Sequence, residues 1–156
     1  MKKITIDVSA SELNGCAPFD INFLDSTNSI RPIIDWSWSF GDGNFSNLEN
    51  PMHQYTSAGL FDVSLSIIND YGCISNEIFQ NFVKVYEKPD ANFYSNPLIS
   101  CVGQSINFSD ISVSNSLITD WLWDFGDGNI SNLQNPIHQY QLTDSYDVTL
   151  IVGLNS

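Results

Sequence analysis

Positive charge is scarce in this chain. Its 156 residues include 5 Lys and Arg against 18 Asp and Glu, so the formal net charge is −13. The stretch 89–156 has no Lys or Arg at all. Proteins that bind nucleic acid use basic side chains to release counterions from phosphates, and anionic membrane surfaces attract basic segments. The composition therefore excludes nucleic acid and membrane surfaces as expected partners.

Long apolar runs are also missing. A membrane-spanning helix needs about 20 consecutive apolar residues, and no run here approaches that length. Lys2 and Lys3 are not followed by the apolar stretch of a signal peptide, so any export signal is expected outside these residues. Hydrophobic residues still make up 42% of the chain, which is enough for a packed core. We therefore expect globular structure without membrane insertion.

The chain contains one unit twice. The run 36–44 (WSWSFGDGN) recurs as 121–129 (WLWDFGDGN), and the step from residue 36 to residue 121 is an offset of 85. The same offset aligns further pairs without a gap: Cys16 with Cys101, Asn50-Pro51 with Asn135-Pro136, and His53-Gln54-Tyr55 with His138-Gln139-Tyr140. Such agreement is the mark of an internal repeat. It predicts two domains, 1–87 and 88–156.

The second copy is shorter than the first. The offset places Tyr71 opposite the last residue, Ser156, so the counterparts of Cys73 and of the run 75–87 would follow the end of the chain. We therefore expect a piece of a longer protein, whose second domain lacks its final strand. An unpaired strand edge next to 148–152 and a less complete core than in the first copy should result.

Apolar residues recur with a period of two, which is typical of half-buried β-strands. Examples are Phe19, Ile21 and Phe23; Trp36, Trp38 and Phe40; and Phe61, Val63 and Leu65. Clusters of Gly, Pro, Asn, Asp and Ser separate these runs, and the run 42–44 (DGN) is a hairpin turn pattern. Six or seven short strands in about 85 residues predict an all-β fold of two tandem two-sheet sandwiches.

The alternation also predicts which side chains form the two cores. The predicted core residues are Trp38, Phe40, Phe23, Val63 and Leu65 in the first copy, and Trp123, Phe125, Phe108, Val148 and Leu150 in the second. An error of one residue in this phase would turn every side chain to the other face of its sheet.

Three motifs in a fixed order carry a resemblance to a known family. The runs 38–43 (WSFGDG), 50–55 (NPMHQY) and 59–65 (GLFDVSL) resemble the PKD (polycystic kidney disease) domain. The resemblance covers the whole unit and occurs twice. The version with Cys16 and Cys73 resembles arrays on large exported surface proteins of gliding, Bacteroidetes-like bacteria. It implies immunoglobulin-like sandwiches placed outside the cell or at its surface, and it does not imply catalysis.

From this resemblance we expect a non-catalytic extracellular spacer or adhesion module of a larger repeat-containing surface protein. Its expected partners are neighbouring PKD-type modules of the same chain, with weak contacts to polysaccharide or surface protein as a further expectation. The alternative is an accessory carbohydrate-binding module of a secreted hydrolase. We expect no cofactor in either case.

Catalytic and metal sites are not expected either. Each copy has one histidine, His53 or His138, and no zinc-ligand spacing or Ser-His-Asp pattern accompanies it. Asp42 and Asp127 lie in Gly-Asp-Gly turns, where one carboxylate supplies too few oxygens for calcium. Turn formation is therefore the preferred interpretation of these two residues.

Four tryptophans occupy two kinds of position. Trp38 and Trp123 are expected in the cores, like the central tryptophan of immunoglobulin domains. Trp36 and Trp121 lie two residues earlier on the same strand face. Two alternatives remain for them: the rim of the core, or an exposed platform on which a sugar ring stacks. They are the candidate ligand contacts.

The three cysteines suggest disulfides if the protein is exported. A bond between Cys16 and Cys73 is the obvious pairing, but in the expected topology Cys16 begins the second strand and Cys73 the seventh. A strand of about six or seven residues should separate them, so they should lie at opposite ends of the sandwich, roughly 20 Å apart. A disulfide requires Cα atoms within about 7 Å.

Bridges between neighbouring modules are therefore the predicted arrangement. Cys16 would pair with a cysteine beyond Ser156, and Ser156 should lie near it. Cys73 would pair with a preceding module and Cys101 with a following one, which leaves all three cysteines unpaired within this chain.

Phe61 and its counterpart Tyr146 occupy the position of the tyrosine corner of immunoglobulin domains, where a hydroxyl bonds to the backbone upstream. Only the second copy has the hydroxyl, so this hydrogen bond can form only there, at Tyr146.

Overall fold

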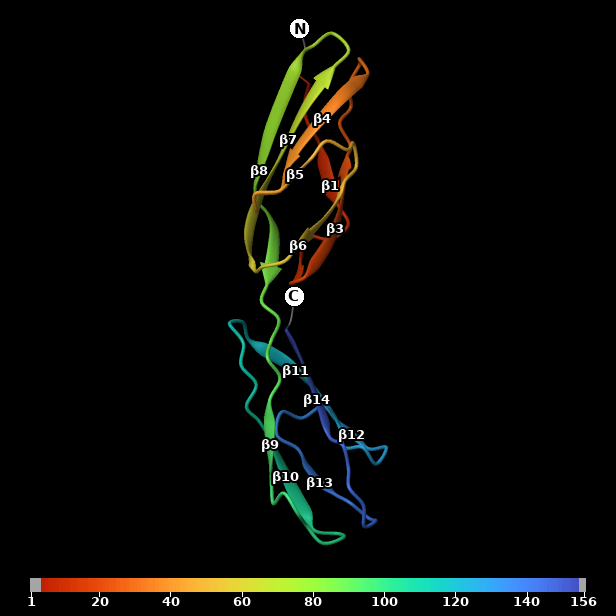
Figure 1. The fold of residues 1–156 in the computed structure, drawn as a ribbon, viewed down its shortest axis with the longest axis vertical. Helices are drawn as coiled ribbons and strands as arrows, with labels where there is room; N and C mark the ends of the chain where they lie inside the picture. Colours follow the sequence, from red (N-terminus) through yellow and green to blue (C-terminus); the bar gives the residue numbers. More distant parts are fainter. Residues whose placement is uncertain (1–3, 155–156) are drawn as a thin grey trace. The chain divides into compact units, whose positions relative to one another are not determined.

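The computed structural model describes residues 4–154, which form β-strands joined by turns and loops (Figure 1). The chain divides into two compact units, Met1–Glu87 and Lys88–Ser156. Within residues 4–154, no helix is long and apolar enough to cross a membrane.

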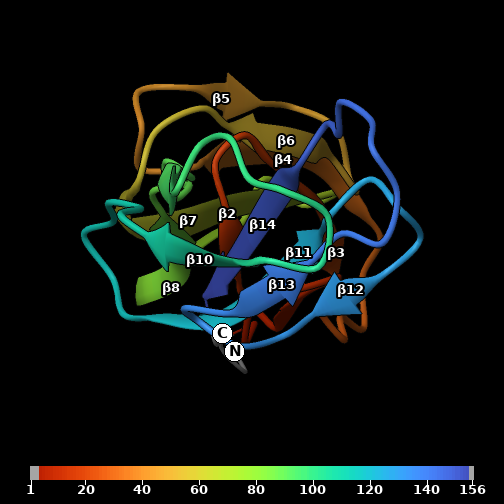
Figure 2. The same cartoon turned by 90° about the horizontal axis from the view of Figure 1, so that it is seen from below.

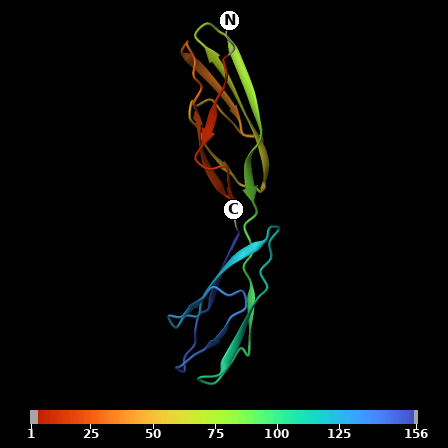
Figure 3. The ribbon, with the colours of Figure 1, turned by 180° about the vertical axis from the view of Figure 1, so that it is seen from behind.

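The first unit is a sandwich of two sheets. A three-stranded sheet has the order β1-β3-β6, and a five-stranded sheet has the order β2-β8-β7-β4-β5. The strands are β1 (Val8–Ala10), β2 (Asn14–Cys16), β3 (Phe19–Asp25), β4 (Ile33–Ser39), β5 (Phe45–Ser46), β6 (Met52–Tyr55), β7 (Gly59–Asn69) and β8 (Ile74–Tyr86). In Figure 3, β8 is the yellow-green to green strand that runs along one side of this unit.

The second unit repeats the sandwich with fewer strands. Its two three-stranded sheets have the orders β13-β10-β9 and β12-β11-β14, and Figure 2 shows β10 beside β13. The strands are β9 (Phe93–Asn96), β10 (Ser105–Asp110), β11 (Ile118–Asp124), β12 (Ile130–Ser131), β13 (Ile137–Gln139) and β14 (Thr149–Leu154). The predicted fold is confirmed: two all-β, immunoglobulin-like sandwiches, the second without a final strand.

The period of two places the side chains as expected. Along β7, Val63 and Leu65 are fully buried, while Ser64 between them faces away from the core. The central tryptophan pairs across the sheet in the same register in both units, Trp38 with Leu65 and Trp123 with Leu150. The repeat in sequence is therefore a repeat in strand pairing.

Eight of the ten predicted core residues are buried, with exposed fractions of 3% or less. The prediction is wrong for Val148 and Leu150, which are only half-buried. Their counterparts in the first unit lie on β7, which is flanked by β4 on one side and by β8 on the other. β14 pairs with β11 and, among the described residues, with no second strand. The predicted unpaired edge is confirmed, and it explains the exposure.

Candidate functional site

Each unit contains the same polar cluster, built from the Gly-Asp-Gly turn and the strand that carries the histidine. In the first unit, Asp42 Oδ1 accepts a hydrogen bond from the backbone N–H of Asn44 at 3.0 Å. Asp42 Oδ2 accepts one from the Asn44 side chain at 3.0 Å and lies 2.8 Å from His53 Nε2. An ionised carboxylate only accepts hydrogen bonds, so Nε2 carries the proton in this pair.

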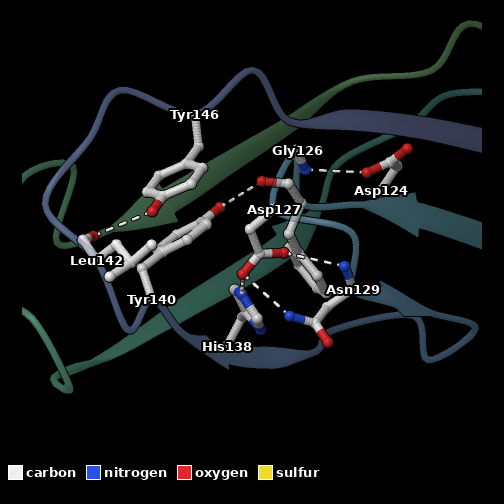
Figure 4. Close-up of polar contacts among 9 residues, drawn as sticks. Asp124, Gly126, Asp127, Asn129, His138, Tyr140, Leu142 and Tyr146 are labelled. Atoms are coloured by element: carbon white, nitrogen blue, oxygen red, sulfur yellow. Dashed lines mark hydrogen bonds and ion pairs between the residues drawn. The ribbon is translucent and has the colours of Figure 1, made fainter.

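The second unit repeats these contacts closely (Figure 4). His138 Nε2 lies 2.8 Å from Asp127 Oδ2, and the side chain of Asn129 donates to the same oxygen at 3.1 Å. The backbone N–H of Asn129 donates to Asp127 Oδ1 at 3.0 Å. The interpretation of Asp42 and Asp127 as turn-forming residues is therefore confirmed, because each carboxylate bonds the backbone two residues ahead.

The turn needs glycine before the aspartate. Gly41 has a φ of 83°, and a Cβ added there would lie 2.5 Å from the carbonyl oxygen of Asp62. Gly126 has a φ of 77°, and its added Cβ would lie 2.6 Å from the carbonyl oxygen of Asp147. No side chain fits this approach of two backbone segments, so the glycine positions the aspartate that follows it.

Aromatic rings hold the histidine in place. The His53 ring stacks on Phe40, with centroids 4.1 Å apart and an angle of 4° between planes. It meets the Tyr55 ring edge-on at 4.6 Å, and the Tyr55 hydroxyl donates to the Phe40 carbonyl at 2.9 Å. In the second unit His138 makes the corresponding contacts with Phe125 and Tyr140.

The cluster changes the acidity of its members. Burial alone would raise the pKa of the Asp42 carboxyl, but hydrogen bonds from Asn44 and His53 lower that pKa below its ordinary value. The pKa of Asp127 is lowered against burial in the same way, by Asn129 and His138. Burial, with the nearby Asp127 carboxylate, raises the pKa of Tyr140 to about 12, and burial likewise raises the pKa of Tyr55.

These interactions occupy the carboxylate oxygens and the imidazole nitrogen that a catalytic or metal-binding site would use. Both carboxylate oxygens of Asp42 are bonded, and the His53 ring lies between aromatic side chains with its side chain only 11% exposed. Across residues 4–154, no group of three or more His, Cys, Asp or Glu side chains could hold a metal ion. The arrangement fastens the turn after β4 to β6, and the turn after β11 to β13.

The candidate ligand contacts Trp36 and Trp121 are half-buried and pack against the edges of their cores. The indole N–H of Trp36 donates to Asp25 Oδ2 at 2.8 Å, and that of Trp121 donates to Asp110 Oδ2 at 2.7 Å. The indole is thus oriented by a carboxylate in both units. Contact with a sugar stays a prediction.

The partners of these indoles, Asp25 and Asp110, were not predicted from the sequence. Each also accepts a backbone N–H two residues ahead, at 2.9 Å. Burial opposes ionisation of Asp110, but bonds from Ser112, Trp121 and Gln134 lower its pKa. One pattern in the sequence could have identified them: an Asp precedes each of these tryptophans by 11 residues in both copies.

A groove of about 920 Å³ opens in the first unit between the segments 4–7, 26–31 and 69–76. Arg31 lies on its wall, 3.1 Å from Asp70 and with its guanidinium 3.7 Å from the centre of the Tyr71 ring. Cys73 also lines this groove. An ion pair and a ring contact thus hold the arginine at the wall of the groove.

The cysteines are free and exposed. Cys16 pairs with Tyr86 at the end of β8, whereas Cys73 immediately precedes the start of that 13-residue strand. At 3.3 Å per residue they are about 40 Å apart, because β8 is twice as long as the expected strand of six or seven residues. Their pairing with other modules stays a prediction, and Ser156, which was expected near Cys16, lies outside the described residues.

The comparison with known families agrees with this architecture. A model of the PKD domain matches residues 4–83 and again residues 86–156. The chain belongs to the PKD domain family. PKD domains are in general non-catalytic modules, which agrees with clusters whose polar groups are bonded to one another.

Similar proteins include two bacterial collagenases. A microbial collagenase from Vibrio alginolyticus is 45% identical over 52 residues, which are 31% of this chain and 6% of that protein. Collagenase ColQ1 from Bacillus cereus (strain Q1) is 54% identical over 35 residues, which are 22% of this chain and 4% of that protein. The PKD pair thus matches a small part of each relative's length.

One solved structure shares the sandwich fold across the chain. It was reported in a study of promiscuous specificity in carbohydrate-binding modules of the β-sandwich superfamily. It has a TM-score of 0.51 at 12% identity, covering 97% of this chain and 84% of that one. At this identity the likeness concerns the fold alone.

Proposed function

We propose that this PKD pair is a non-catalytic extracellular spacer and adhesion module of a larger repeat-containing surface protein, of the kind that Bacteroidetes-like bacteria export. Its work is to lengthen and stiffen an array and to present other domains. Neighbouring PKD modules are its main partners, and contacts with polysaccharide or surface protein are weak.

One observation carries this proposal: the chain enters and leaves the first unit at opposite ends. The carbonyl of Ile4 accepts a hydrogen bond from the Ser75 hydroxyl at 2.9 Å, near the start of β8. The unit ends just after Tyr86, at the other end of the same strand. The 11 residue steps from Ser75 to Tyr86 span about 36 Å, so each module adds its full length to an array.

Small-angle X-ray scattering of chains with two, three and four repeats of residues 1–87 tests the spacer role. The maximum dimension should rise by at least about 36 Å with each added repeat. A dimension that levels off as repeats are added would contradict the proposal, because modules that fold back on one another cannot act as spacers.

The alternative function is an accessory carbohydrate-binding module of a secreted hydrolase. The similarity to two collagenases favours attachment to a secreted enzyme. In this case the Trp36 and Trp121 rings would contact the polysaccharide, since aromatic faces stack on sugar rings.

Pull-down on insoluble cellulose, chitin and collagen fibrils separates the two functions. The spacer proposal predicts at most weak retention on the three, and none that depends on Trp36 and Trp121. The alternative predicts retention on a polysaccharide that the double variant Trp36→Phe/Trp121→Phe keeps in part and Trp36→Ala/Trp121→Ala removes. Phe45→Ala, at an aromatic that is 72% exposed, is the matched control and should leave retention unchanged.

We also propose that disulfides to modules outside residues 1–156 reinforce the array, through Cys73 on one side and Cys101 on the other. Each bond forms when two thiols transfer two electrons and two protons to a disulfide oxidant such as oxidised glutathione. Mass spectrometry of the full-length protein isolated without reductant should find Cys73 and Cys101 in peptides linked to other modules. Unmodified thiols at both positions would refute the bridges.

A further inference from the structure

The groove of the first unit has three walls, and hydrogen bonds join them. The Ser75 hydroxyl donates to the Ile4 carbonyl at 2.9 Å. The backbone N–H of Ser26 donates to the Asp7 carbonyl, also at 2.9 Å. The wall 4–7 is thus held at both ends by later parts of the unit, whatever precedes it in the chain. A groove of about 920 Å³ that is fixed in this way suits a ligand, because a site formed before binding costs less to order.

The Arg31 cluster, which consists of Arg31, Asp70 and Tyr71, forms one side of this groove. The Arg31 Nε–H donates to Asp70 Oδ1 at 3.2 Å, and Nη2 lies 3.1 Å from Asp70 Oδ2. The guanidinium also lies over the Tyr71 ring, 3.7 Å from its centre. Asn69 Oδ1 accepts the backbone N–H of Tyr71 at 3.0 Å, and the Pro32 carbonyl accepts that of Asp70 at 3.0 Å. The cluster therefore presents the Tyr71 ring, in a residue that is 71% exposed, in one orientation.

The Arg31 cluster is not part of what the two copies share. At the offset of 85, Arg31 corresponds to Ser116 and Asp70 to Asn155, so the second copy cannot form this ion pair. The second unit is a sandwich nonetheless, and its histidine–aspartate distance of 2.8 Å equals that of the first unit. The fold thus does not require the cluster, which favours a role in binding over a role in folding.

The chemistry of the walls favours an uncharged ligand that is rich in hydroxyl groups. Most polar side chains on the walls carry hydroxyl or amide groups, among them Ser26, Asn28, Ser29 and Asn76. The one basic side chain among the described residues of the lining is Arg31, and Asp70 balances its charge. Arg31 keeps further N–H donors for a ligand, because Asp70 takes hydrogens only from Nε and Nη2. An anionic ligand would meet a protein with a formal net charge of −13.

We propose that this groove binds a neutral hexose unit of a polysaccharide. The Tyr71 ring stacks on the apolar face of the sugar, and Arg31 donates hydrogen bonds to its hydroxyl groups. The inference rests on the weak polysaccharide contact within the proposed function, and it places that contact away from Trp36 and Trp121. It does not depend on the spacer role.

Titration of the whole chain with soluble oligosaccharides, followed by NMR of the backbone amides, tests the site. The neutral probes are cellohexaose and chitohexaose, and the anionic probe is hexagalacturonate. We expect amide shifts in the segments 26–31 and 69–76 with a neutral probe, at a Kd of about 0.1–1 mM. Hexagalacturonate should bind about tenfold more weakly or not at all.

Variants of the Arg31 cluster separate binding from folding. Tyr71→Ala should weaken binding of the neutral probe about tenfold, while Tyr71→Phe, which keeps the ring, should stay within about threefold. Tyr94→Ala is the matched control, because this tyrosine is 54% exposed and lies outside the groove. Unfolding temperatures of all three variants should match that of the unmodified chain, since both tyrosines are exposed.

Asp70→Asn gives a readout that a merely structural role would not move. Without the Asp70 carboxylate the charge of Arg31 is unbalanced, so the affinity for hexagalacturonate relative to the neutral probe should rise about tenfold. Equal weakening of all probes by Asp70→Asn would show that the pair only holds the groove in shape, and would overturn the assignment of Arg31 as a ligand contact.

Three other results would overturn the site itself. One is the absence of shifts in 26–31 and 69–76 with either neutral probe up to about 10 mM. Another is a set of shifts centred on Trp36 and Trp121, which would support the alternative function instead. The third is tighter binding of a collagen-like peptide of Pro-Pro-Gly repeats than of either sugar. The scattering test of the spacer role is independent of all three, so failure of this site and failure of the spacer role are distinguishable.

Discussion

The two units repeat one sequence but not one set of strands. Asn14–Cys16 forms β2 in the first unit, whereas the corresponding segment 99–101 is in no strand. β7 is 11 residues long, while its counterpart β14 has only 6. The two largest differences lie in segments that contact β8 in the first unit: β2 pairs with it in parallel, and the first residues of β7 pair with it alone.

This difference shows that some strands depend on a partner rather than on their own sequence. Strand propensity reflects packing against neighbours more than a preference of the backbone itself. Phe61 and Tyr146 are both good strand formers, yet only Phe61 lies in a strand. The pairing with β8 decides the outcome at that position.

The polar clusters show the opposite. Their geometry is the same in the first unit, where β8 completes the sheet, and in the second unit, whose described residues include no such strand. The distance between the histidine Nε2 and the aspartate Oδ2 is 2.8 Å in both units. The stacking distance of that histidine on its phenylalanine is 4.1 Å in one and 4.2 Å in the other. The cluster is therefore set by the turn and two strands, and not by completion of the sandwich.

The largest expected effect is a difference in stability between the two units. The second unit lacks the counterparts of Val83 and Val85, and burial of a valine contributes roughly 1.5–3 kcal/mol. We expect the free energy of unfolding of the second unit to be lower by about 3–6 kcal/mol. Hydrogen exchange of the whole chain should show faster exchange of the slowest amides in β11 than in β4. Equal protection of these two strands would contradict the comparison.

A second effect follows from the core tryptophans, which are 0% exposed in both units. Replacing a buried aromatic residue by alanine costs about 3–5 kcal/mol. We expect Trp123→Ala to unfold the second unit, while Trp38→Ala leaves the first unit folded with a lower unfolding temperature. Circular dichroism and hydrogen exchange would measure both. If Trp38→Ala unfolded its unit and Trp123→Ala did not, the assigned order of stability would be reversed.

The acid side of the pH profile gives a third, smaller effect. The pKa values of Asp42 and Asp127 are lowered in the folded state, so the folded protein binds fewer protons than the unfolded chain. The stability they contribute is present above pH about 4 and is lost as the pH falls through the lowered pKa values. Hydrogen bonds to a charged group contribute roughly 1.5–3 kcal/mol.

Asp42→Asn should therefore destabilise the first unit at neutral pH and flatten its loss of stability in acid. Asp127→Asn should do the same in the second unit and by a similar amount, because the two clusters have the same geometry. Thermal unfolding between pH 3 and pH 7 measures both. A pH profile unchanged by either substitution would show that other carboxylates cause the acid sensitivity.

The sequence was sufficient to predict what depends on local pattern. Alternating residues predicted the sheets and the phase of Trp38, and the Gly-Asp-Gly run predicted the turn. The burial of Val148 and Leu150 was predicted wrongly, because burial also depends on a neighbouring strand. The length of β8 was underestimated because an irregularity interrupts its alternation, where the pairing shifts between Phe61 and Val63.

The bond from Trp36 to Asp25 could not be predicted from chemistry alone. It joins residues on separate strands, 11 positions apart, and neither residue type by itself predicts the other as its partner. Only the repetition of the pair as Trp121 and Asp110 marks it in the sequence. The sequence thus reveals a contact between strands when a second copy preserves both partners.

The smallest expected effect concerns the tyrosine corner, where the two copies differ by one hydroxyl. The Tyr146 hydroxyl donates to the Leu142 carbonyl at 3.0 Å, so the second copy forms the bond that only it can form (Figure 4). Its ring also stacks on Tyr140 at 4.0 Å, as Phe61 stacks on Tyr55 at 4.4 Å. Tyr146→Phe keeps the stacking and removes the hydrogen bond alone.

We expect Tyr146→Phe to lower the free energy of unfolding of the second unit by about 0.5–1.5 kcal/mol, the usual net value of one hydrogen bond. The reciprocal change, Phe61→Tyr, should alter the first unit by less than this, since β8 already holds Phe61 in its strand through pairing with Val83. Denaturant unfolding of both variants measures the difference. We argue that the Tyr146 hydroxyl secures a segment that has no strand partner. A larger effect of Phe61→Tyr than of Tyr146→Phe would contradict this argument, because the hydroxyl would then contribute more in the unit where β8 already pairs with the segment.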